Sequence, residues 1–180
     1  MQAIVVNDTN VFIDLLDIGL LEHFFQLSCE VHTTDFVMFE LSREGQRDAV
    51  EIYQANKRLH VASFEMDELC EIRGQQKVYE NKTNVSLTDC SVWYYAKRKG
   101  YILLIGDRKL KTSSMKDGVE VRGILYVFDK LVEEAILTPA IAAEKLKQLQ
   151  IINPRLPKDE IEKRIKSWKG ASKRKEEANQ

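Results

Sequence analysis

Two acidic residues follow the two most apolar runs of the chain and together could hold a divalent cation. Asp8 comes directly after residues 3–7, and Asp107 comes just after residues 101–105, in the segment Ile105-Gly106-Asp107. If both runs are neighbouring parallel strands, their carboxyl ends lie at the edge of the sheet where ligands bind in open α/β folds. Two carboxylates brought together there repel each other unless a hard cation lies between them. The sequence therefore predicts a carboxylate site at this edge.

Two further acids are candidates for the same site, although each has an ordinary structural explanation. Asp89 lies in the first turn of a predicted helix, where Ser86-x-x-Asp89 resembles a capping box and an acid stabilises the helix on its own account. Glu40 lies in an apolar segment, Phe36-Val37-Met38-Phe39-Glu40-Leu41, and could simply be a solvated partner of Arg43. Taken together, the four acids carry more weight than any one of them.

Short β-rich runs alternate with longer helical patterns along the chain, which is typical of βαβ units around a largely parallel sheet. The apolar runs at 3–7 and 101–105 are expected to be central, adjacent strands covered by helices on both faces. The predicted strands are residues 3–7, 30–34, 59–64, 101–105 and 119–122. The predicted helices are residues 11–27, 35–43, 46–58, 66–81, 87–99, 124–136 and 139–149.

Several helix ends are marked in the sequence. Thr138 before Pro139 predicts an N-cap with proline at the first helical position, and Gly100 is expected to end the helix whose last residues are basic. Residues 1–153 are expected to form one domain. Residues 154–180 are expected to form a C-terminal segment, with an amphipathic helix at 157–168 and a basic, flexible tail from Gly170 onward.

The composition describes a folded protein without metal or disulfide staples. The chain has 180 residues, of which 44% are hydrophobic and 31% charged, enough to bury a full core. Its three cysteines lack CxxC spacing and its histidines lie far apart, which disfavours structural zinc and indicates a reducing, cytoplasmic setting. The apolar runs are too short to span a membrane, and no signal peptide is expected. Residues 1–154 hold 18 Lys and Arg against 23 Asp and Glu, and this acidic body argues against indiscriminate nucleic-acid binding.

The order and setting of the four acids resemble the PIN-domain nucleases, whose best-known bacterial members are the VapC-like toxins of toxin-antitoxin pairs. The resemblance extends over about residues 3–137. Its segments are Val6-Asn7-Asp8-Thr9-Asn10-Val11-Phe12, Phe36-Val37-Met38-Phe39-Glu40-Leu41, Leu87-Thr88-Asp89, Leu103-Leu104-Ile105-Gly106-Asp107-Arg108-Lys109-Leu110-Lys111 and the trailing Val119-Glu120-Val121-Arg122-Gly123-Ile124-Leu125.

The resemblance implies a three-layer α/β/α sandwich with a mostly parallel central sheet, and hydrolysis of phosphodiester bonds in RNA with Mg²⁺ or Mn²⁺. Asp8, Asp89 and Asp107 are then the expected metal ligands, because hard cations prefer carboxylate oxygens. Glu40 is expected to orient a water molecule or to act as general base. The sequence also departs from the family pattern, since many relatives have Thr or Ser at the position of Ile105, and some carry a further acid after the last one.

Neighbouring polar residues are expected to support this site. Thr9 and Asn10 are candidates for hydrogen bonds to the acids, although Asn10 could instead cap the first helix. Arg108, Lys109 and Lys111 are candidates for contacts with substrate phosphates, and the alternative for them is a solvated helix face. Four acids without a matching context were expected on the surface, namely Asp14, Asp17, Asp117 and Asp129.

The expected partners are an RNA substrate, an antitoxin protein and a second copy of the chain, with no membrane. A homodimer would use apolar positions of the helices after the second strand, whereas residues 157–168 are expected to fold back on their own domain. One alternative function is a catalytically weak RNA- or protein-binding module on the same fold. Another is a phosphatase-like domain with Asp8 as nucleophile, which ordinarily has a second acid where Asn10 stands.

Overall fold

A computed structural model describes the backbone of residues 3–178 and the side chains of residues 3–79, 84–107 and 110–170. Contacts along the chain group it into two compact units. The sheet unit comprises Met1–Ile13 and Ser28–Ile124, and the helical unit comprises Asp14–Leu27 and Leu125–Gln180. The domain boundary expected between residues 153 and 154 stays a prediction.

The sheet unit is built on five parallel strands in the order β3-β2-β1-β4-β5. The predicted adjacency of the first and fourth strands is confirmed, since Asn7 pairs with Leu104. Val5, Val6, Leu103 and Leu104 are almost completely buried, as expected for central strands. The strands are β1 (Ala3–Asn7), β2 (Cys29–Thr34), β3 (Leu59–Ala62), β4 (Ile102–Leu104) and β5 (Val121–Arg122).

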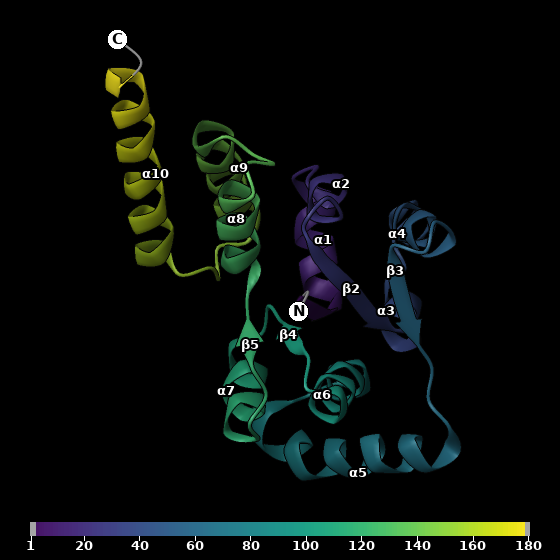
Figure 1. Cartoon of the computed structure of the whole chain (residues 1–180). Coiled ribbons are helices and arrows are strands. Elements are labelled where there is room, and N and C mark those ends of the chain that lie inside the picture. Colours follow the sequence, from purple (N-terminus) through teal and green to yellow (C-terminus); the bar gives the residue numbers. More distant parts are fainter. Residues whose placement is uncertain (1–2, 179–180) are drawn as a thin grey trace. The chain divides into compact units, whose positions relative to one another are not determined.

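Helices flank this sheet, which gives the predicted α/β/α architecture (Figure 1). Helix α6 packs on β1, β2 and β4 and buries Trp93 completely. The sheet unit contains α3 (Asp35–Glu40), α4 (Gln46–Ala55), α5 (Met66–Thr83), α6 (Leu87–Lys99), α7 (Arg108–Lys116) and the first residues of α1 (Thr9–Asp17).

The helical unit contains the rest of α1 together with α2 (Leu21–Phe24), α8 (Ile124–Glu133), α9 (Pro139–Ile152) and α10 (Lys158–Ala178). Ile161 is completely buried, and Trp168 stacks on Phe128 with ring centroids 6.5 Å apart. Helix α10 also packs along α9. The apolar stripe predicted for the C-terminal helix therefore docks on helices of its own chain.

The marked helix ends are confirmed. The Ser86 side chain accepts a hydrogen bond from the backbone N–H of Asp89, whose carboxylate accepts one from the backbone N–H of Ser86, which completes the capping box. Gly100 follows α6 in the left-handed conformation, at φ 69°, which a glycine adopts without steric cost. The Thr138 side chain caps α9 by accepting from the N–H of Ile141.

Three expectations about the helices were wrong. The helix predicted at 11–27 is two helices, because the chain turns at Gly19 with φ 68°. Helix α7 was not among the predicted helices, because most of its residues are polar and the sequence shows no clear apolar face. Only the structure shows that Leu110 and Ser114 are buried. The C-terminal helix does not end before Gly170 but continues to Ala178, because one helical glycine costs only about 1 kcal/mol relative to alanine.

The four acids placed on the surface by the sequence do not behave alike. Asp14 is only 7% exposed and accepts hydrogen bonds from Asn153 Nδ2 at 3.2 Å. Burial raises its pKa to about 6. The expectation of a surface position for Asp14 was therefore wrong. The amide that binds its carboxylate belongs to Asn153, which is 139 residues away along the chain and could not be connected with Asp14 from the local sequence.

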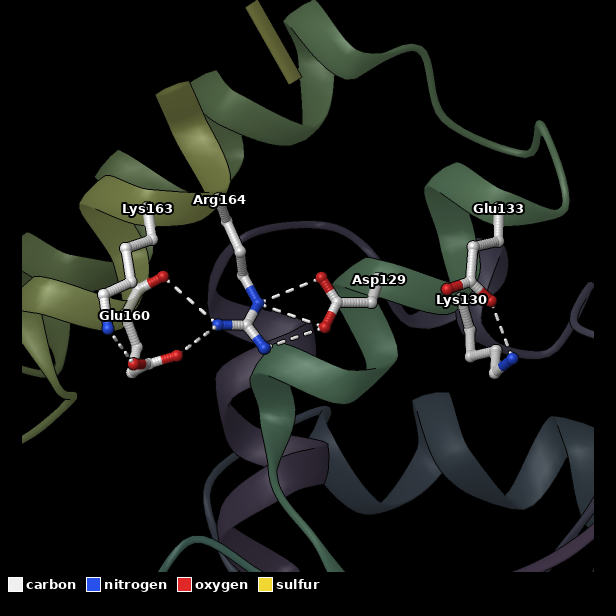
Figure 2. Close-up of polar contacts among 6 residues, drawn as sticks. All are labelled: Asp129, Lys130, Glu133, Glu160, Lys163 and Arg164. Carbon is white, nitrogen blue, oxygen red and sulfur yellow. Dashed lines mark hydrogen bonds and ion pairs between the residues drawn. The ribbon is translucent and has the colours of Figure 1, made fainter. Parts of the chain in front are cut away.

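Arg164 on α10 binds a carboxylate of α8 through two nitrogens (Figure 2). Its Nε and Nη2 donate to Asp129 at 2.9 Å, and its Nη1 donates to Glu160 Oε2 at 3.1 Å. The Arg164 side chain is 24% exposed, whereas the Lys130–Glu133 pair in the same view is 37% and 59% exposed. Bidentate geometry and partial burial make the first pair the stronger one.

We expect Asp129→Ala to lower the free energy of unfolding by about 1–2 kcal/mol, because a half-buried guanidinium loses its bidentate partner. Glu133→Ala is the matched control on the same helix, and its effect should stay below about 0.5 kcal/mol. Urea denaturation followed by circular dichroism measures both. Equal effects of the two substitutions would contradict the conclusion that the Asp129–Arg164 pair stabilises the fold more than the Lys130–Glu133 pair.

None of the helices in the described part of the chain combines the length and apolar character needed to cross a membrane.

Candidate active site

The strand order places two of the four acids at the switch point of the sheet. The chain passes from β1 to β2 and β3 on one side and to β4 and β5 on the other, so β1 and β4 flank the point where ligands bind in such folds. Asp8 follows β1, and its backbone N–H donates to the carbonyl of Leu104 on β4 at 3.1 Å. Asp107 follows β4 after two further residues. The predicted juxtaposition of these strand ends is confirmed.

Asp8 is the buried member of the group, with 1% of its surface exposed. The backbone N–H of Thr9 donates to Asp8 Oδ1 at 2.7 Å, and Asn10 Nδ2 donates to Oδ2 at 3.2 Å. Burial raises the pKa of Asp8 to about 7, the nearby carboxylate of Asp89 adds to the rise, and Glu40 adds less. The two hydrogen bonds oppose this shift. Asp8 is thus a carboxylate whose charge lacks a cation among the described side chains.

Glu40 reaches the same place from the end of α3. Its Oε2 accepts a hydrogen bond from the Thr9 hydroxyl at 2.5 Å, and the Glu40 side chain itself is exposed. Helix α3 begins directly after β2, so its short length sets Glu40 near the carboxyl edge of the sheet. The Thr9 hydroxyl therefore connects Glu40 to the start of α1, and Arg43 is not needed to explain the position of Glu40.

Asp89 combines the capping role with proximity to the other acids. Its Oδ2 accepts from the Ser86 N–H at 2.9 Å. Burial raises its pKa, the Ser86 hydrogen bonds lower it, and the charges of Glu40 and Asp107 raise it. Because Asp89 interacts electrostatically with the other three acids, the four carboxylates form one acid cluster, defined here as Asp8, Glu40, Asp89 and Asp107.

Asp107 caps the helix that the sequence analysis missed. Its Oδ1 accepts from the backbone N–H of Leu110 at 2.8 Å, which is an N-cap contact. The spacing of Asp107 and a buried apolar Leu110 was the sequence signal for α7. Asp107 is exposed, so one side of the acid cluster faces solvent.

The supporting residues lie where they can hold the acids. Thr9 and Asn10 each donate to a member of the acid cluster. Asn10 does not cap α1, because α1 begins at Thr9 and Asn10 is its second residue. Lys111 is exposed on α7. The side chains of Arg108 and Lys109 lie outside the described residues, so their predicted contacts stay predictions.

Two residues near the acid cluster escaped the sequence analysis. Gly106 lies so close to Asn10 that an added Cβ would be 3.1 Å from the Asn10 Cβ, so a larger residue would require Asn10 to shift slightly. The Asn7 side chain is completely buried, and neither of its polar atoms has a hydrogen-bond partner among the described residues. A Gly directly before an acid and an Asn at the end of an apolar run were the available signals.

The donor chemistry of the acid cluster suits Mg²⁺ or Mn²⁺, which prefer oxygen ligands. Burial, and after it the repulsion among the acids, raises the pKa of Asp8 and Asp89, and a bound cation would oppose both effects. Among the described residues no three His, Cys, Asp or Glu side chains are arranged so that they could hold a metal ion. Asp8, Asp89 and Asp107 are the side chains that would hold the ion, and one oxygen each of Asp89 and Asp107 also accepts a backbone hydrogen bond.

A family model described as the PIN domain matches residues 4–170. This chain belongs to the PIN-domain family. The sequence-based resemblance is thereby confirmed, and so is the coarse activity class of a PIN-type nuclease. A search of curated proteins finds no match.

Solved structures with similar folds include two named VapBC complexes. VapBC2 from Rickettsia felis, solved with a DNA fragment from its promoter, is 12% identical over 67% of this chain and 98% of its own, with a TM-score of 0.45. VapBC-1 from nontypeable Haemophilus influenzae is 18% identical over 68% and 98%, with a TM-score of 0.46. A protein from Pyrobaculum aerophilum is 15% identical over 76% and 100%, with a TM-score of 0.49.

We expect Asp8→Asn to stabilise the metal-free protein above pH 7. An acid whose folded pKa exceeds its ordinary value of 3.8 binds its proton more tightly when folded, so wild-type stability should fall as the pH rises from about 4 to about 7. Asparagine does not titrate, and at pH 8 the variant should gain about 2–4 kcal/mol in free energy of unfolding, since one pKa unit corresponds to about 1.4 kcal/mol.

Urea titrations in chelator-treated buffer at pH 5 and pH 8 measure this effect. Asp48→Asn, at an exposed position of α4, controls for the loss of one negative charge. If the free energy of unfolding of Asp8→Asn changes with pH as that of the wild type does, the Asp8 carboxyl does not become charged in a buried position.

Proposed function

We propose that this PIN-domain protein hydrolyses RNA phosphodiester bonds with Mg²⁺ or Mn²⁺ and serves as the toxin of a toxin-antitoxin pair. The observation that carries the proposal is the acid cluster at the switch point of the sheet, with the buried Asp8 at its centre. Four carboxylates that repel one another destabilise the fold when no cation is bound, and they supply oxygen ligands when a cation is bound. The VapBC complexes of similar fold support the toxin role.

Each acid has a distinct proposed role. Asp8, Asp89 and Asp107 would hold the ion, which supplies charge neutralisation at the phosphate and a more acidic bound water. Glu40 accepts a hydrogen bond from Thr9 through one oxygen, and its other oxygen would orient the attacking water and take its proton. Asn10 holds Asp8 in place through Oδ2. Thr9 and Asn10 are therefore positioning residues.

The substrate would approach the exposed side of the acid cluster. Asp107 and Lys111 are exposed there, and Lys111 with Arg108 and Lys109 would bind phosphates on either side of the cleaved bond. Like-charged phosphate and carboxylates repel, so these cations and the metal together make the approach favourable.

A catalytically weak binding module remains the second candidate. Ile105 is 3% exposed and supplies no hydroxyl where many relatives have Thr or Ser. The caps formed by Asp89 and Asp107 also give both acids a purely structural use. This candidate predicts RNA binding without cleavage, whereas an aspartyl-phosphate mechanism is disfavoured because Asn10 replaces the second acid and is bonded to Asp8.

We expect Asp8→Asn to reduce Mg²⁺- or Mn²⁺-dependent RNA cleavage at least 100-fold while the protein stays folded. Glu40→Gln should reduce cleavage as well, because glutamine cannot take the proton of the attacking water. Glu40 is not one of the three proposed metal ligands, so metal binding should be kept. Cleavage of a mixed cellular RNA by nuclease-free preparations, with and without chelator, measures this. Asp48→Asn is the control, and cleavage by Asp8→Asn at the wild-type rate would refute the catalytic assignment.

The same proposal includes a homodimer that uses the helices after β2. Phe39 on α3 is 71% exposed and Ile52 on α4 is 58% exposed, which leaves apolar side chains uncovered on these two helices. Helix α10 already packs on α9 and is the less suitable contact.

We expect light scattering to give a dimer for the full chain and for a chain ending before Pro157, because the proposed contact lies on α3 and α4. Ile52→Glu should shift the protein toward monomer, since a charge in an apolar contact is costly to bury. Val78→Glu, at an exposed apolar position of α5, is the control. A monomeric wild-type protein would refute the dimer, and loss of the dimer on truncation would move the contact to α10.

A further inference from the structure

A pocket of about 510 Å³ lies between α5 and α6 and contains none of the four acids of the acid cluster. In Figure 1, α6 is seen nearly end-on and α5 from the side, so the two helices cross steeply where they pack. The pocket falls within the size range of small-ligand sites. Its lining residues are Glu71, Gln75 and Tyr79 of α5, Tyr94, Lys97 and Arg98 of α6, and Asp117.

A row of aromatic rings connects this pocket with the acid cluster. Phe36 lies one helical turn before Glu40 on α3, and its ring centroid is 6.2 Å from that of Phe64. The Phe64 ring lies 5.9 Å from Tyr94, which lines the pocket. Phe36, Phe64 and Tyr94 are all half-exposed. These three residues define the aromatic row, and each of them keeps part of its surface exposed.

The pocket and the acid cluster also share α6. Asp89 lies in the first turn of this helix, whereas Tyr94 and Arg98 lie five and nine residues later. With a rise of 1.5 Å and 3.6 residues per turn, these positions are about 7.5 and 13.5 Å further along the helix axis and on roughly the opposite face of α6 from Asp89. A single strand held at the acid cluster therefore has to pass around α6, over the side that Phe36 and Phe64 occupy, to reach the pocket.

The charges of the pocket favour a flat polar ring over a simple anion. Arg98 lies 5.7 Å from the centre of the Tyr94 ring, and its Nη1 donates to the Tyr94 hydroxyl at 2.7 Å. Lys97 pairs with Asp117 at 2.8 Å, and Glu71 adds a second carboxylate. Arg98 lies 3.8 Å from Glu68, so both cations of the pocket have a carboxylate partner. Tyrosine faces together with donors and acceptors of both kinds suit a nucleobase.

We propose that the pocket binds a nucleobase of single-stranded RNA, and that the aromatic row guides the strand between this pocket and the acid cluster. Bases stack on aromatic side chains without strong sequence preference, and nearby arginines add cation–π attraction. The inference rests on the proposed ribonuclease function and adds a binding site for the substrate away from the cleaved bond. Tyr94 is then a substrate-binding residue and takes no part in the chemical step.

The test measures RNA affinity in a protein that cannot cleave. In the Asp8→Asn background, fluorescence anisotropy gives the Kd for a labelled single-stranded oligouridylate of twelve nucleotides at fixed salt. Tyr94→Leu should raise this Kd about 5- to 100-fold, because it removes a stacking surface. Tyr94→Phe should bind almost as the parent, since it keeps the ring.

The chain offers a matched control on another helix. Tyr126 on α8 has Lys130 5.7 Å from its ring, the same cation–ring distance as in the Tyr94–Arg98 pair. Tyr126→Leu should leave the Kd unchanged. Circular dichroism checks the fold of each variant. If Tyr94→Leu unfolds, the fallback is Gln75→Leu combined with Tyr94→Phe. This combination keeps the aromatic ring and changes another residue that lines the pocket, so it should still raise the Kd.

The outcomes separate this inference from the proposed function. If Tyr94→Leu binds the oligonucleotide as tightly as Tyr126→Leu, or the parent does not bind it at all, the inference is overturned. A pocket that holds a protein segment instead of RNA would give the first of these results. In the cleavage assay on otherwise wild-type protein, Tyr94→Leu should raise KM and leave kcat unchanged. Cleavage with an unchanged KM would leave the ribonuclease standing and refute the base site.

Discussion

The buried carboxylate of Asp8 is the constraint on which the rest of the site depends. A charged side chain that is only 1% exposed, at the end of a central strand, is unfavourable. Two hydrogen bonds, from the Thr9 N–H and from Asn10 Nδ2, stabilise the Asp8 carboxylate. No cation among the described side chains neutralises it. Asp89 and Glu40 then make the local charge more negative. A fold that keeps this arrangement spends stability at one point of the sheet, which is the usual physical signature of a functional site.

Helix α6 carries both the stability and the proposed chemistry of the sheet unit. Its buried face packs on three strands and encloses Trp93, its capping box fixes the position of Asp89, and its C-terminal half lines the pocket through Tyr94. Structural and functional uses of Asp89 are therefore compatible. The capping hydrogen bonds lower the pKa of Asp89, whereas burial and the other acids raise it, so the cap helps to keep a crowded carboxylate ionised.

Much of the fold follows from local patterns, and the site depends on contacts that these patterns do not contain. The apolar runs predicted β1 and β4 as neighbours, and capping signals placed the ends of α6. Gly19 was a visible signal for the break in the first helix, but the amphipathic pattern across it outweighed the glycine. The burial of Asp14 could not be predicted, because its partner Asn153 comes from a distant segment. Long-range pairing of polar groups leaves no periodic trace in a sequence.

Gly106 shows how the backbone itself limits what the site can become. The chain between β4 and α7 passes close to Asn10 without a side chain, and an added Cβ would lie 3.1 Å from the Asn10 Cβ. A residue of any other type would therefore require a shift of Asn10, which donates one of the two hydrogen bonds to the Asp8 carboxylate. The position of Asp107, the cap of α7 and the orientation of Asp8 are therefore linked through a single short connection. A substitution at Gly106, the residue before Asp107 in sequence, therefore also bears on Asp8 through Asn10.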